Sequence, residues 1–71
     1  MAIMTSAKSI GDAIRKHREI QNLSQEKLAM MSGTSKAHIW RIENARVSTR
    51  LETLARIAKS LDVGLSELLT Q

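Results

Sequence analysis

The chain lacks cysteine and proline, and it contains only three glycines and one aromatic residue, Trp40. Without cysteine, neither a disulfide framework nor a thiolate metal site can hold this small fold together. The absence of proline and the few glycines favour helices joined by short turns. No strand-like alternation of polar and apolar residues persists along the chain. We therefore predict an all-α fold with a core of aliphatic side chains.

Long apolar runs are also missing from the sequence. None approaches the roughly 20 residues that a membrane-spanning helix needs. The N-terminal residues MAIMTSAKS lack the apolar core of a signal peptide. We expect a soluble, cytoplasmic protein with no membrane partner. Its 71 residues predict a single domain over residues 1–71, with an ordered core over about 9–69 and no separate ligand-sensing or catalytic domain.

Residues that support catalysis or metal binding are scarce. The two histidines, His17 and His38, are 21 positions apart, and no metal-ligand spacing is present. A helical domain of this size also has little room for a substrate cleft. We therefore predict no enzymatic activity, no catalytic residue, no metal site and no cofactor.

Positive charge is in excess and is concentrated in one region. The net charge is +4 and the isoelectric point is about 10.1. Residues 34–50 contain four cations and the single anion Glu43, and so account for +3 of this charge. A basic segment of this kind points towards a polyanionic partner. The four cations are Lys36, Arg41, Arg46 and Arg50.

Residues 24–43, with the sequence SQEKLAMMSGTSKAHIWRIE, predict two short helices joined by a glycine turn. Ser24 is suited to cap the first helix, and Gly33 is suited to the left-handed conformation that ends it. Ser35 is suited to cap the second helix. In this second helix, Ile39 and Ile42 share one face. The opposite face, which remains available for recognition, contains Lys36, Ala37, Trp40, Arg41 and Asn44.

Three further helices complete the expected fold. The first is predicted from about Ile10 to Gln21, with Ser9 as its N-cap and Asn22 ending it. A fourth extends to about Ser60, and a short fifth covers Leu65 to Leu69. The expected buried stripe of the first helix is Ile10, Ala13, Ile14 and His17. The fourth is expected to have a capping-box pair, Thr49 and Glu52, and a stripe of Leu51, Leu54, Ile57, Ala58 and Leu61.

These residues resemble the phage-repressor and Cro type of helix-turn-helix domain, also called the Xre family. The resemblance implies a compact five-helix bundle whose second and third helices bind DNA, over Gln25 to Met31 and Lys36 to Asn44 here. The chain departs from the family at Ala45 and Thr49, where glycine and proline are usual. The matching residues are Ile10, Gly11, Arg18, Leu23, Ser24, Gln25, Leu28, Ala29, Gly33, Ser35, Ile39, Ile42, Glu43, Leu51, Leu54, Ala58 to Leu61, Leu68 and Leu69.

The resemblance also implies roles for individual residues towards double-stranded DNA. Lys36, Ala37 and Arg41 occupy positions that reach base edges; the alternative is that the cations are only solvated. Arginine can contact guanine O6 and N7 with two hydrogen bonds, and alanine can touch a thymine methyl group. Gln25 occupies a position that contacts phosphate, and its alternative is an exposed glutamine without a partner. The expected contacts with the DNA backbone are Gln25, Ser35, His38, Asn44, Arg46 and Arg50.

Trp40 has two open interpretations. As the only aromatic residue it would be expected in the core, but the helical wheel places it beside the base-reading positions. It either touches DNA, together with Lys36, Ala37 and Arg41, or packs beside the neighbouring helices.

Glu43 falls on the packed face of the third helix, where an unpaired carboxylate would be costly. It therefore needs a cation. The resemblance implies that Arg18 of the first helix is this partner, and we predict a structural salt bridge between the two residues.

The expected mode of action is repression by occupying a palindromic operator as a homodimer. A single helix reads too few base pairs for high specificity, so two reading helices about 34 Å apart are expected. Following the family, the dimer contact is expected around Val47, Leu65 and Leu69. An antitoxin-like protein that also binds a protein partner is the alternative, motivated by Met30 and Met31. These methionines could equally fill gaps or form the dimer contact.

Overall fold

The computed structural model describes residues 6–69, and within this range helices are joined by turns and loops and no strand is present. The predicted all-α, five-helix fold is therefore confirmed. Residues 1–5 and 70–71 of the predicted domain lie outside the described residues. The helices are α1 (Ala7–Ile20), α2 (Gln25–Ser32), α3 (Lys36–Glu43), α4 (Leu51–Ser60) and α5 (Leu65–Leu69).

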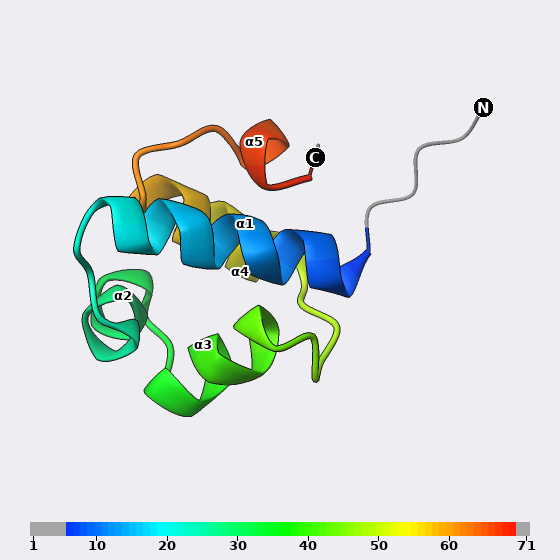
Figure 1. The fold of residues 1–71 in the computed structure, drawn as a ribbon, viewed down its shortest axis with the longest axis horizontal. Helices are drawn as coiled ribbons and strands as arrows, with labels where there is room; N and C mark the ends of the chain where they lie inside the picture. The colour runs from blue at the N-terminus through cyan, green and yellow to red at the C-terminus, as the bar shows by residue number, and fades with distance from the viewer. Residues whose placement is uncertain (1–5, 70–71) are drawn as a thin grey trace.

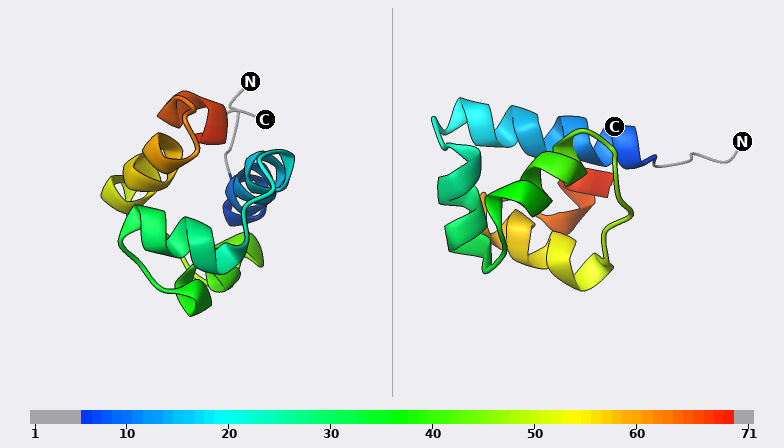
Figure 2. Two further views of the ribbon diagram at one scale, coloured as in Figure 1. Left: turned by 90° about the vertical axis from the view of Figure 1, so that its left-hand side faces the viewer. Right: turned by 90° about the horizontal axis from the view of Figure 1, so that it is seen from below.

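The longest helix, α1, crosses the molecule and separates α5 from α3 (Figure 1). Helix α3 packs against both α1 and α2, while α5 packs against α1 and α4. In the side view, α2 and α3 lie at the opposite end of the molecule from α5 (Figure 2). The helix-turn-helix therefore forms one side of the bundle and leaves the outer surface of α3 uncovered.

The core is built from aliphatic side chains of all five helices, as the composition predicts. Each helix turns its apolar stripe inwards, because burying that surface is the main favourable term in folding. No aromatic ring is part of this core. The buried hydrophobic residues are Ala13, Ile14, Leu28, Ala29, Ile39, Ile42, Leu54, Ile57, Ala58, Leu61 and Leu68.

The first helix begins earlier than the sequence predicts. The predicted N-cap, Ser9, is wrong: it lies inside the helix, and its N–H donates to Ser6 Oγ at 3.1 Å. Ser6 is the N-cap, in an extended conformation. Ala7 and Lys8 favour helix, so the helix extends back to the earlier serine. At the other end, Asn22 has φ +57°, which is the left-handed conformation expected of it.

The start of α4 also differs from the prediction. The expected capping box of Thr49 and Glu52 does not form, because α4 begins at Leu51 and places Arg50 at the N-cap without a side-chain hydrogen bond. The prediction that Leu51 is part of the buried stripe is also wrong, since this residue is 60% exposed. Leu51 occupies the first turn, where no neighbouring element among the described residues covers it. His17, predicted to be buried in α1, is only half-buried.

The loop between α3 and α4 passes through a left-handed residue. Ala45 has φ +56°, a region in which an L-residue with a β-carbon is strained. Its N–H donates to the Ile42 carbonyl at 3.2 Å, and the Arg46 N–H donates to the Arg41 carbonyl at 2.8 Å. The C-terminal end of α3 is therefore capped by a left-handed residue, the conformation that glycine adopts most easily, although the residue present is alanine.

Candidate nucleic-acid interface

Each helix of the helix-turn-helix begins with a serine whose side chain caps it. Ser24 Oγ accepts from the Lys27 N–H at 2.9 Å and begins α2. Ser35 Oγ accepts from the His38 N–H at 3.1 Å and begins α3. Between them, Gly33 has φ +71°, and nothing within 4 Å would obstruct a side chain there. Its backbone conformation, not its surroundings, therefore requires glycine.

Helix α3 has one buried face and one exposed face. Ile39 and Ile42 are buried against α1 and α2. The four predicted base-reading residues all lie exposed on the other side of the helix. This arrangement places two cations, one methyl group and one indole on a single surface; these residues are Lys36, Ala37, Trp40 and Arg41.

Trp40 lies on this exposed surface and is not part of the core. Its side chain is 46% exposed. The Arg46 guanidinium lies 6.0 Å from the centre of the indole ring, a distance at which a cation is attracted to the ring face. Asn44 Nδ2 donates to the Trp40 carbonyl at 2.8 Å. Trp40 is therefore supported by neighbouring polar residues while its ring remains accessible.

The six residues predicted to contact the DNA backbone lie around the exposed face of α3. Ser35, Arg46 and Arg50 are exposed, whereas His38, Asn44 and Gln25 are half-buried. Gln25 begins α2, Ser35 caps the start of α3, and the other four lie in α3 or in the segment between α3 and α4. The structure therefore gathers cations and polar groups around α3, and their contacts with DNA stay predictions.

Glu43 anchors α3 to the rest of the bundle. Its carboxylate is buried, and Arg18 Nε donates to Oε2 at 2.7 Å while Arg18 Nη2 donates to Oε1 at 3.0 Å. This two-pronged geometry is the strongest arrangement for an arginine and a carboxylate. Arg18 Nη1 also donates to the Leu23 carbonyl at 2.8 Å. The predicted ion pair is thus present in the structure, and it joins α1, the following turn and α3.

Two further donors on Glu43 were not predicted from the sequence. Arg15 Nε donates to Oε1 at 3.4 Å and Gln25 Nε2 donates to the same oxygen at 3.1 Å. Burial alone would raise the pKa of Glu43. The hydrogen bonds from Arg18, Gln25 and Arg15 and the positive charge of Arg18 outweigh burial and hold the pKa below its usual value. The spacing of Arg15 on the same helix face as Arg18 was the available signal.

The backbones of α1 and α3 approach closely at Gly11. A β-carbon at this position would lie 2.4 Å from the Ile42 carbonyl oxygen and 2.8 Å from that of Glu43. Only glycine permits this approach without a shift of one helix. The C-terminal end of α3 therefore lies directly against α1.

The predicted dimer residues are partly buried against the core. Val47 lies in the loop before α4, and Leu65 and Leu69 belong to α5. Leu51, beside this loop, is more exposed than any of the three and was placed in the core by the sequence pattern. Only its position in the folded chain identifies it as a candidate contact.

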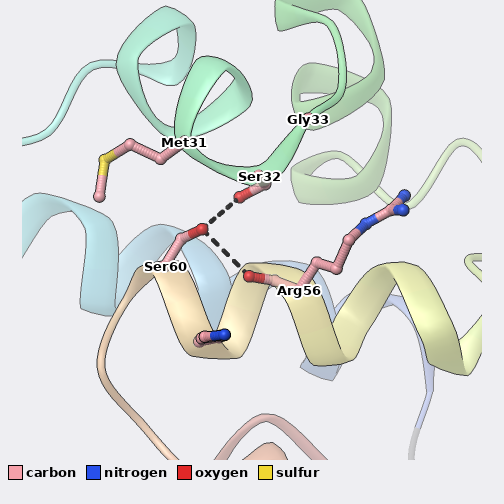
Figure 3. A pocket seen from close by; sticks show the side chains of 6 residues that line it. Met31, Ser32, Gly33, Arg56 and Ser60 are labelled. Atoms are coloured by element: carbon pink, nitrogen blue, oxygen red, sulfur yellow. Dashed lines mark hydrogen bonds between the residues drawn. The ribbon is translucent and has the colours of Figure 1, made fainter.

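A hollow of about 700 Å³ lies between the end of α2 and α4 (Figure 3). Met31 and Gly33 form one side, and Arg56 and Lys59 are on the other. Its floor is a hydrogen-bonded pair, in which Ser32 Oγ donates to Ser60 Oγ at 3.0 Å. Met30 next to it is 66% exposed. The methionines therefore do not fill gaps in the core of residues 6–69.

None of the helices in residues 6–69 is long and apolar enough to cross a membrane. Within the same range, no cluster of three or more His, Asp or Glu side chains is arranged to hold a metal ion.

A family model described as helix-turn-helix matches residues 14–68. This chain belongs to the helix-turn-helix family. The match includes all of α2, α3 and α4, the second half of α1 and most of α5, so it covers both the exposed surface of α3 and the Arg18–Glu43 ion pair. The resemblance to DNA-binding proteins of the phage-repressor and Cro type is thereby confirmed, and with it the general class of DNA-binding transcription regulators.

Three similar proteins illustrate this family. The chain is 37% identical over 62 residues to the control protein C.SmaI of Serratia marcescens, covering 87% of this chain and 74% of that protein. The solved structure of the restriction-modification controller protein C.AhdI of Aeromonas hydrophila matches with a TM-score of 0.85 and 29% identity, covering 87% and 94% of the two chains. The P22 c2 repressor, solved with a synthetic operator, matches with a TM-score of 0.81 and 28% identity over 86% and 92%.

Proposed function

We propose that this helix-turn-helix protein is a sequence-specific repressor that binds double-stranded DNA as a homodimer in the cytoplasm. The observation that supports this function best is the exposed face of α3, carried by a helix that a buried ion pair holds in place. The domain over residues 1–71 acts by binding alone, without catalysis. Bound to a palindromic operator, it represses by blocking access to the promoter.

In this proposal, sequence is read by the exposed residues of α3. Arg41 donates to guanine O6 and N7, Lys36 reaches the same acceptors, and Ala37 touches a thymine methyl group. Trp40 contacts a thymine methyl group or a sugar, with the Arg46 guanidinium 6.0 Å from the centre of its ring. The surrounding residues hold the phosphates and position the protein without specifying sequence. These are Gln25, Ser35, His38, Asn44, Arg46 and Arg50.

The homodimer places two copies of α3 in successive major grooves about 34 Å apart. We propose that its contact surface consists of Val47, Leu51, Leu65 and Leu69. The exposure of Leu51 supports this position, because a large exposed apolar side chain is stabilised by burial against a second copy.

The likeness to C.SmaI and C.AhdI supports a more specific role. Both proteins are named as control or controller proteins, and the second is named as part of restriction-modification. We propose that this chain is also a control protein, which regulates expression of genes next to its operator.

Selection of bound fragments from a random DNA pool tests the proposal directly. We expect one palindromic motif with two half-sites separated by one helical turn. Arg41→Ala should then weaken binding to the selected site by about 1 to 3 kcal/mol and relax the preference at one base pair. An unchanged preference among sites would show that the base-reading face is assigned wrongly. A promoter-reporter fusion carrying the motif gives the sign of regulation, and repression is expected.

Arg46→Ala distinguishes positioning from reading. We expect this variant to bind all DNA sequences more weakly and to lower the slope of log K against log salt by about one per protomer. The order of preference among sites should remain that of the parent. A changed order would make Arg46 a reading residue.

Binding of a protein partner, as in an antitoxin-like regulator, is the second candidate function. The exposed Met30 and Met31 at the edge of the hollow between α2 and α4 favour it, because flexible apolar side chains suit adaptable binding surfaces. Pull-down with and without DNA separates the two functions. A stoichiometric protein partner supports this second candidate, whereas recovery of DNA alone supports a free-standing regulator.

A further inference from the structure

We propose that Arg15 of α1 forms, together with Gln25, a binding site for one phosphate of the DNA backbone. This inference rests on the proposed DNA-binding function and adds a contact from the scaffold helix. Neither the helical wheel of α3 nor the basic segment 34–50 includes Arg15, which lies far away in the sequence.

The site is built around one oxygen of Glu43. Both Arg15 Nε and Gln25 Nε2 donate to Glu43 Oε1, at 3.4 Å and 3.1 Å. The two side chains therefore lie next to each other, although they come from different helices. Gln25 is the first residue of α2, where the helix dipole and the unpaired amides of the first turn favour an anion. Glu43 thus holds the Arg15 guanidinium beside the start of α2.

The two arginines on Glu43 have different tasks. Arg18 uses three nitrogens on Glu43 and Leu23, and its side chain is only 12% exposed. Among the described residues, Arg15 donates a side-chain hydrogen bond only through Nε, to Glu43, and its side chain is 42% exposed. A guanidinium has five N–H donors in a fixed fork. The terminal N–H groups of Arg15 are therefore available to donate hydrogen bonds to an anion from solvent.

The charge balance at this position also favours an anion. Two arginines surround the single carboxylate of Glu43, which leaves one positive charge in the cluster. The nearest acidic residue along α1, Asp12, is engaged by Lys8 at 2.9 Å. Arg15, Lys8, Asp12, Asn44 and Ala45 line, with Glu43, an open hollow of about 270 Å³. Gln25 does not line this hollow, so the proposed phosphate is placed at the start of α2 and not within the hollow.

Arg15→Gln tests the site, with Lys16→Gln as a control that removes the same charge one residue along α1. Binding to the selected operator is measured by fluorescence anisotropy over a salt titration. We expect Arg15→Gln to lower the slope of log K against log salt by about 0.9 per protomer, and to weaken binding about eightfold per protomer near 0.1 M salt. The preference among sites should not change. Lys16→Gln should retain the slope of the parent protein.

Arg15→Lys separates phosphate binding from support of Glu43. Lysine keeps the charge but lacks the guanidinium fork, so the salt slope should recover in this variant while urea unfolding midpoints of all variants stay close to that of the parent. Phosphate ethylation interference should lose one signal per half-site in Arg15→Gln only. If Arg15→Gln keeps the full salt slope, or loses discrimination between sites, the phosphate site is refuted. If the parent protein itself selects no motif, the proposed function fails instead.

Discussion

At the scale of single residues, Glu43 joins three helices through its hydrogen bonds. A buried carboxylate is stabilising here only because donors from α1 and α2 satisfy both of its oxygens. The same contacts determine how α3 is oriented on the scaffold. Stability and the proposed DNA recognition therefore depend on the same side chain, although Glu43 itself faces away from the proposed DNA surface.

Glu43→Ala should lower the free energy of unfolding by about 3 kcal/mol, because Arg18 is left buried without its partner. The control is Glu52→Ala. The Glu52 carboxylate is exposed and lies 3.9 Å from Arg56, so its loss should cost less than about 0.5 kcal/mol. Urea unfolding followed by circular dichroism measures both. Superimposable melts for Glu43→Ala and the parent would contradict the structural role of the pair.

The lowered pKa of Glu43 predicts a pH dependence of stability. In the unfolded chain a glutamate titrates near pH 4.3. The contribution of Glu43 is therefore fully present above that pH and is lost as the pH falls through the lower pKa of the folded state. Urea unfolding at a series of pH values should show stability declining below about pH 5. Glu43→Gln should flatten this decline, and an equally steep decline in that variant would assign it to other carboxylates.

Ala45 provides a test of backbone strain. Its positive φ costs about 1 kcal/mol, which glycine avoids, although glycine loses more entropy on folding. We expect Ala45→Gly to raise the free energy of unfolding by about 0.5 to 1 kcal/mol. The matched control is Ala55→Gly, an exposed position within α4, which should lower it by about 1 kcal/mol. Destabilisation by both changes would show that the loop does not need the left-handed conformation.

At the scale of helices, a close backbone contact between α1 and α3 at Gly11 positions α3 on the scaffold. Gly11→Ala places a methyl group against the Ile42 and Glu43 carbonyls, and overpacking of this kind costs about 1 to 3 kcal/mol. Because α3 must move, DNA affinity should fall as well. Gly64→Ala is the control, since a β-carbon there meets only Ser66 Oγ at 3.7 Å. Equal stability of the Gly11 variant and the control, measured by thermal unfolding, would contradict the close contact.

The helices were predictable to different degrees, for physical reasons. Local signals at Ser24, Gly33 and Ser35 act within one or two turns, and they predicted the bounds of α2 and α3 closely. The starts of α1 and α4 were misplaced for different reasons. In α1, two serines three residues apart, Ser6 and Ser9, could each act as the cap. In α4, the N-cap position is taken by Arg50, which makes no side-chain cap, and not by Thr49. Helical periodicity also placed Leu51 in the core, since it does not reveal where neighbouring helices end.

At the scale of the whole molecule, the proposed dimer contact is centred on Leu51, the most exposed of its four apolar residues. Leu51→Glu should weaken self-association about a hundredfold, because burying two leucine side chains contributes about 3 kcal/mol. The control is Ile20→Glu, which changes another exposed apolar residue. Ile20 is the last residue of α1, and the loop before α4 lies near the other end of that helix (Figure 1). Sedimentation equilibrium measures both. A parent protein that is monomeric both free and on operator DNA would overturn the dimer.

The sequence by itself determined the helical class, the caps around the turn and the two faces of α3, because these follow from contacts within a few residues. It also identified Arg18 as the partner of Glu43, through the family resemblance. Only the tertiary structure brought Arg15 and Gln25 to the same oxygen, required glycine at Gly11 and left Leu51 exposed, and it decided that Trp40 lies outside the core. These features depend on how close separate helices approach, which no local pattern specifies.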